Sequence, residues 1–235
     1  MEISLVFDMQ ELIIFCILIM GVFITWSTEA LGSYIKLVSM SANRNIVGVS
    51  LVQAISVISR LGFFSQSFAF AWIIDSRLFI ETRINLFVSC LITVLFSLVL
   101  LKYKGDKIVK IVFKFYHKIG VIKDLNINDI KVLKLNKKIK PPKLYVFAYL
   151  MLYMGSFSPL IIQLANLDFA ARSVALSGII NGVSTIMLLS YVDVKFARDL
   201  EESELSLIPE ELIFARYYAV GILILLSTVF CVYLN

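Results

Sequence analysis

Charged residues are scarce in this chain. They make up 17% of its 235 residues, whereas an average soluble domain contains about 25%. Apolar residues reach 60% and the mean hydropathy is +0.90, so an ordinary soluble domain is excluded and an integral membrane protein is predicted. The net charge of +5 does not indicate a nucleic-acid partner. Most Lys and Arg residues flank apolar runs, where the positive-inside rule expects them.

Residue types that commonly build enzyme sites are also few. His117 is the only histidine and lies in a lysine-rich stretch. Cys16, Cys90 and Cys231 fall within apolar runs without paired spacing, so we expect buried free thiols. The chain contains no Gly-rich phosphate loop, H-E-x-x-H or G-x-S-x-G motif. We therefore predict no metal site and no cofactor, and an enzyme is the least favoured class.

Long apolar runs dominate what is present. A helix needs about 20 apolar residues to cross a bilayer, and six runs meet this requirement: 9–38, 46–73, 84–102, 144–165, 171–192 and 211–233. The predicted fold is all-α, a six-helix transmembrane bundle with a cytoplasmic amphipathic helix between spans 3 and 4. It divides into helices 1–3 (residues 1–103), a basic loop (104–143) and helices 4–6 (144–235).

The distribution of positive charge predicts the orientation. With both termini outside, 17 of the 22 Lys and Arg residues lie on the inner side. Thirteen of these are lysines between residues 102 and 143. Because Lys and Arg are retained in the cytoplasm, we expect both termini to be outside.

The basic loop contains an amphipathic pattern at residues 107–120. Lys107, Lys110, Lys114 and Lys118 recur at helical spacing, and an apolar set is expected to face away from them: Ile108, Ile111, Val112, Phe115 and Ile119. Such a helix suits an anionic leaflet. Two interpretations stay open, a simple surface anchor and a binding site for anionic phospholipid headgroups.

Polar residues inside the spans form two stripes. Glu29, Ser33 and Lys36 share one face of the first span by their spacing. On the second span a further face contains Gln53, Ser56, Arg60 and Ser67, with Gln66 beside it. An ionised group at the bilayer centre costs about 2.5–3.5 kcal/mol on insertion scales, so we expect the two stripes to face each other or a common cavity.

Glu29 is the expected counter-charge of Arg60. The two could form a buried ion pair that only holds the bundle together. They could also form a cationic site for an anionic substrate, with Glu29 as partner or proton acceptor.

The later spans add further polar features. In GIING, Gly178 and Gly182 predict close helix packing, and Asn181 between them is a candidate cavity residue. Pro159 is expected to free a backbone carbonyl in the fourth span, which another group must then satisfy. Arg216 is expected to snorkel to the inner headgroups.

Three stretches resemble the Amj family of alternate lipid II flippases, which parallels MurJ in function. They are residues 28–75, which include ISRLGFFSQ (58–66), residues 171–197, which include SGIING (177–182), and FARYYAVG (214–221). The shared features are the polar face of the first span, the intramembrane Ser-Arg with a Gln downstream, and the Ser-Gly-x-x-Asn-Gly of the fifth span.

This resemblance implies translocation of lipid II, a polyprenyl-pyrophosphate lipid, from the inner to the outer leaflet of a bacterial cytoplasmic membrane. Arginine suits pyrophosphate because its planar fork donates two parallel hydrogen bonds, so Arg60 is the expected main contact. The other candidate substrate-binding residues are Lys36 and Arg44 at entry, Glu29 for charge balance or proton transfer, Asn181 and Gln66 as neutral hydrogen-bonding groups, and Arg216.

Two other classes remain open. A secondary transporter for a small anion would use the same stripes as an enclosed midplane site. A non-transporting scaffold of cell-envelope synthesis would use the basic loop to bind a partner, and Arg60 would then be structural.

Overall fold

The computed structural model of the protein describes residues 9–41, 45–76, 78, 83–118, 139–165, 170–201 and 208–234. Within these ranges the chain forms seven α-helices and one π-helical segment. Their bounds are α1 Met9–Ser41, α2 Asn45–Asp75, α3 Arg83–Lys118, α4 Lys143–Ala165, α5 Ala170–Met187, η3 Leu188–Asp193, α6 Val194–Glu201 and α7 Ile208–Leu234.

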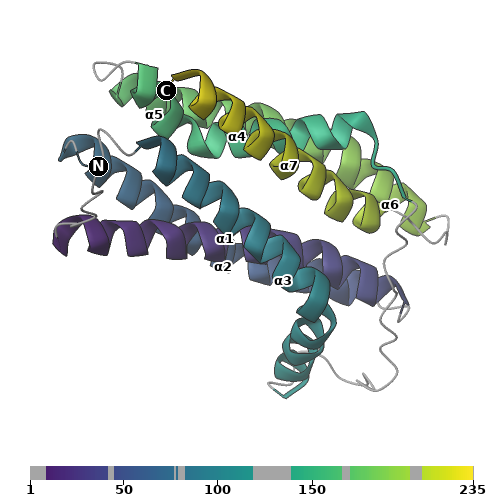
Figure 1. Ribbon diagram of the computed structural model, residues 1–235. Coiled ribbons are helices and arrows are strands. Elements are labelled where there is room, and N and C mark those ends of the chain that lie inside the picture. The colour runs from purple at the N-terminus through teal and green to yellow at the C-terminus, as the bar shows by residue number, and fades with distance from the viewer. Residues whose placement is uncertain are drawn as a thin grey trace.

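The long helices run roughly along one common direction and alternate in sense along the chain (Figure 1). α5, η3 and α6 follow one another without a break. α1 begins and α7 ends at the same end of the bundle, and α6 lies at the opposite end (Figure 1).

Five of the described helical segments are long and apolar enough to cross a membrane: 9–39, 47–75, 84–105, 176–199 and 208–229. α4 is 23 residues long and packs against α5 and α7. The all-helical, membrane-spanning character predicted from composition is therefore present, whereas the count of six spans stays a prediction.

The basic segment differs from its prediction. Residues 107–118 are helical, but they continue α3 rather than forming a separate helix, and residues 119 and 120 lie outside the described residues. Of the expected apolar face, Ile111 and Phe115 are exposed and Ile108 and Val112 are half-buried. Val109 and Phe113 are the fully buried residues of this segment.

α1 and α2 form the most extensive helix pair, and glycines let their backbones meet. A Cβ atom on Gly62 would lie 2.7 Å from the backbone nitrogen of Thr25, and one on Gly21 would lie 2.7 Å from that of Gln66. Only residues without a side chain fit at these positions, which is the usual reason for glycine between membrane helices.

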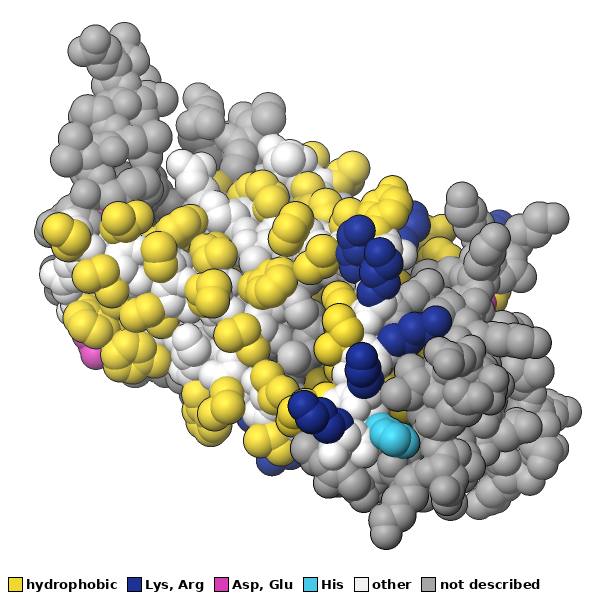
Figure 2. Space-filling model, turned by 90° about the horizontal axis from the view of Figure 1, so that it is seen from below, with side chains coloured by type: hydrophobic (Ala, Val, Ile, Leu, Met, Phe, Trp, Pro, Cys, Tyr) yellow, Lys and Arg dark blue, Asp and Glu magenta, His cyan; other side chains and the backbone are white. Residues whose placement is uncertain are grey.

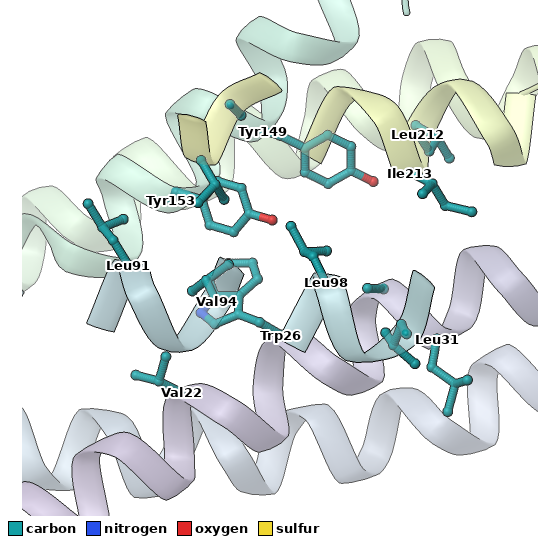
Figure 3. Packing of buried hydrophobic residues seen from close by; sticks show 14 of the residues in the cluster. Val22, Trp26, Leu31, Leu91, Val94, Leu98, Tyr149, Tyr153, Leu212 and Ile213 are labelled. Atoms are coloured by element: carbon teal, nitrogen blue, oxygen red, sulfur yellow. The ribbon is translucent and has the colours of Figure 1, made fainter. Parts of the chain in front are cut away.

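Aromatic side chains connect the two halves of the chain in the core (Figure 3). The ring of Trp26 in α1 lies 4.5 Å from that of Tyr153 in α4 and 6.3 Å from that of Phe157. Phe157 in turn contacts Phe87 of α3, with 6.1 Å between ring centroids. These contacts join α1 and α3 to α4, and Trp26 also lines the polar cavity described below.

Two predictions about packing are corrected. A Cβ atom added to Gly178 or Gly182 would meet no atom of the described residues within 4 Å, so the two glycines of GIING do not pack closely against a described helix, although Asn181 between them lies against α4. Cys90 is a buried thiol as expected, whereas Cys16 is exposed on α1; the side chain of Cys231 lies outside the described residues.

Candidate functional site: a polar cavity between the two halves

A cavity of about 510 Å³ lies between residues of α1 and α2 on one side and residues of α4, α5, η3 and α7 on the other. It brings together five of the seven residues predicted to bind substrate: Glu29, Lys36, Arg60, Asn181 and Arg216. The polar stripe of α1 therefore shares one cavity with Ser56 and Arg60 of the α2 stripe, whereas Gln53 and Ser67 do not line it. Arg44 lies outside the described residues.

Arg216 is buried within this site, with 4% of its side chain exposed. Its Nη2 atom donates to the backbone oxygen of Glu29 at 3.0 Å and lies 3.8 Å from the Glu29 carboxylate. The guanidinium also lies 4.4 Å from the ring centroid of Tyr149. The snorkelling predicted for Arg216 is thus wrong, because an ion pair and an aromatic face hold it inside the bundle.

Glu29 is consequently the partner of Arg216 rather than of Arg60. Its carboxylate also accepts a hydrogen bond from the Ser59 hydroxyl at 3.1 Å. Ser59 precedes Arg60 on α2, so one turn of α2 both anchors Glu29 and presents Arg60. Arg60 and Arg216 both line the cavity that contains Glu29. The sequence alone could not show which of the two arginines pairs with Glu29, because that depends on how the helices pack.

Lys36 is neutralised by a residue that the sequence analysis missed. Its Nζ atom donates to Asp193 Oδ1 at 3.2 Å and lies 5.0 Å from the ring centroid of Phe196. Asp193 is the last residue of the π-helical segment η3. Single π-turns are frequent at functional sites, and this one ends with the carboxylate that pairs with the cation of α1. The place of Asp193 directly after Val192, the last residue of the fifth predicted span, was the available signal.

Arg60 is the cation of this cavity that remains without an ion pair to any described carboxylate. It is exposed and lies at the centre of α2, which runs from Asn45 to Asp75. Three cations, Lys36, Arg60 and Arg216, and two carboxylates line the cavity. Since the other two cations are paired, the excess positive charge resides at Arg60.

The position of Asn181 depends on the proline of α4. Pro159 has no N–H to donate to the carbonyl of Gly155 four residues earlier. That carbonyl instead accepts from Ser177 of α5 at 2.7 Å and from Ser158 at 2.9 Å. The expectation that another group satisfies the freed carbonyl is confirmed, and the group is a hydroxyl of the neighbouring helix.

The hydrogen bond from Ser177 to α4 also holds Asn181, one turn further along α5, beside α4. Its Oδ1 atom lies so close to Gly155 that a Cβ there would clash, and it accepts from the Ser156 hydroxyl at 3.4 Å. Gln66 lies outside the cavity lining: it is buried, and its Nε2 atom donates to the backbone oxygen of Ser156 at 3.3 Å. Gln66 thus connects α2 to α4 behind the cavity.

The cavity opens sideways between α2 and the α5–η3 segment. Lining residues on both sides, including Arg60, Phe63, Thr185 and Leu189, are exposed on the molecular surface. Among the described residues α2 makes no extensive contact with α5 or η3. The opening lies beside Arg60, at the middle of α2. Apolar side chains next to Arg60 are exposed as well, and Leu61 is 64% exposed.

The described part of the chain holds no group of three or more His, Cys, Asp or Glu side chains placed to bind a metal ion. Comparisons with protein-family models, curated proteins and solved structures find no match to this chain. Fold and site together define a helical protein with membrane-spanning character and a polar cavity that opens to the side.

Proposed function

We propose that the protein is a lipid II flippase that moves undecaprenyl-pyrophosphate-linked peptidoglycan precursor from the inner to the outer leaflet of a bacterial cytoplasmic membrane. In this proposal α4 is a sixth span and both termini are outside. The observation that carries the proposal is the exposed Arg60 at mid-helix, which forms no ion pair with any described carboxylate and lies on a polar cavity that opens sideways.

The energetic cost of Arg60 supports an anionic ligand. A charged residue facing hydrocarbon at the bilayer centre costs about 2.5–3.5 kcal/mol or more. Glu29 and Asp193 pair with other cations, so no described carboxylate of the chain offsets this cost. A pyrophosphate would do so, because arginine donates bidentately to phosphate oxygens.

The sideways opening supports a lipid-linked cargo over a small free anion. A polyprenyl chain has to remain in the bilayer while its polar headgroup crosses it, and an opening at mid-helix permits this arrangement. An enclosed midplane site would favour the small-anion transporter instead. Asn181, Thr185 and Ser156 line the same cavity and supply neutral hydrogen-bonding groups for a headgroup.

The decisive test uses the purified, full-length protein in vesicles that contain a fluorescent lipid II analogue. Translocation is measured as the loss of label accessible from one side. We expect Arg60→Ala to reduce the rate at least about tenfold, the loss expected when a charged hydrogen-bonding group is removed. Arg60→Lys should keep part of the rate because it retains the charge but not the fork.

Gln53→Ala is the matched control, since Gln53 is exposed on the same helix but does not line the cavity. A bacterium depleted of its own lipid II flippase offers the cellular version, with growth as the readout. Absence of translocation by the correctly inserted unmodified protein would refute the flippase proposal. A normal rate for Arg60→Ala would refute the assignment of the site alone.

A further inference from the structure

The last part of α3 leaves the bundle. The C-terminal part of this helix turns steeply across the direction of the other long helices (Figure 1). Gly105 permits this close passage, because a Cβ atom there would lie 3.1 Å from the Tyr34 ring of α1. If the bundle crosses a bilayer, a segment oriented in this way runs along the membrane surface.

The exposed face of this segment mixes cations with large apolar side chains. Lys104, Lys107, Lys114 and Lys118 are exposed, and they recur on one helical face. On the same face Ile111 is 66% and Phe115 is 57% exposed. In water such apolar side chains would be unfavourably hydrated, whereas at a membrane interface they enter the acyl boundary beside the lysines.

The position of the cations relative to the bundle agrees with this location. Figure 2 shows a row of basic side chains along the border of a broad apolar surface, ending beside the histidine, His117. Asp106 is the one acidic residue between positions 102 and 118. A row of lysines at the edge of the apolar surface lies where lipid phosphates begin.

We propose that residues 103–118 of α3 form a surface that binds the anionic phospholipid headgroups of the leaflet at this end of the bundle. Lys107, Lys114 and Lys118 contact the phosphates, while Ile111 and Phe115 insert below them. This interaction is independent of the polar cavity, and it selects the lipid composition around the protein.

Hydrogen–deuterium exchange of the full-length protein in vesicles tests this proposal. Amides of residues 103–118 are compared in phosphatidylcholine vesicles and in vesicles that also contain phosphatidylglycerol. We expect exchange about tenfold slower in the anionic vesicles, because bound headgroups oppose local opening of the helix. The difference should shrink at high salt, about 0.5 M, which screens exposed charges.

Lys107→Gln/Lys114→Gln should abolish the difference between the two lipid compositions. Lys140→Gln/Lys143→Gln is the matched control, since it removes two exposed lysines at the other end of the basic region, outside α3. Equal exchange of the unmodified protein in both vesicle types would overturn the proposal, even if the variants fail to fold. The same reduction by both double variants, or protection by a soluble acidic protein or RNA but not by phosphatidylglycerol, would also overturn it.

Discussion

The helix pairs α1–α2 and α4–α5 face each other across the cavity, and their closest contacts differ. In α1–α2 the backbones meet directly at Gly21 and Gly62, and Ser59 donates across this tight contact to the Glu29 carboxylate. In α4–α5 the contact depends on hydrogen bonds to the carbonyl that Pro159 leaves free, with Ser177 as the donor from the neighbouring helix.

The two walls of the cavity are expected to differ in how easily they move. A steric contact between backbones has little tolerance, so Arg60, two residues from Gly62, is presented from a rigid support. The Gly155 carbonyl has a second donor in Ser158 of its own helix, so it stays satisfied if Ser177 moves away. We therefore expect the wall that carries Asn181 to be the one that can shift during transport.

The largest loss of stability is expected from adding a side chain at the contact between α1 and α2. Gly62→Ala places a Cβ atom within 3 Å of the backbone and side chain of Thr25, and overpacking of this kind costs about 3 kcal/mol. The measurement is the free energy of unfolding in mixed micelles. A cost near zero would show that the α1–α2 contact is not the rigid support we describe.

A smaller effect is expected at the α4–α5 contact. Ser177→Ala should cost about 0.6 kcal/mol, the average for a hydrogen bond between membrane helices, because Ser158 still serves the carbonyl. The double variant Ser158→Ala/Ser177→Ala should cost about 2 kcal/mol, since the buried carbonyl of Gly155 then has no partner. Additive single-variant costs in a double-mutant cycle would contradict this shared role.

The smallest effect is expected at Gly178. Gly178→Ala adds a Cβ atom where no described atom lies within 4 Å, and alanine favours the helix by up to about 1 kcal/mol. Thermal unfolding in detergent should therefore show unchanged or slightly higher stability. A large loss would mean that GIING packs against another molecule, and it would restore the original interpretation of the motif.

The sequence was sufficient for the class of fold and for the choice of most candidate residues. Apolar runs of membrane length predicted the start of each long helix to within three residues, since the length of such a run is a local property. The end of α3 was not predicted, because the helix continues to Lys118. The helical spacing of Glu29 and Lys36, and of Ser56 and Arg60, predicted two polar faces that now line one cavity. Pro159 predicted a freed carbonyl because its missing N–H is a property of the residue itself.

The pairing of charges required the tertiary structure. Arg216 lies 187 residues after Glu29 and Asp193 lies 157 residues after Lys36, and no local pattern relates positions so far apart. Ion pairs from α1 to α7 and to η3 occupy both carboxylates of the cavity, and no described carboxylate pairs with Arg60. The sequence thus determined that an arginine stands in the middle of a membrane-length helix, and the packing of the two halves decided that the described carboxylates of the cavity pair with the other two cations.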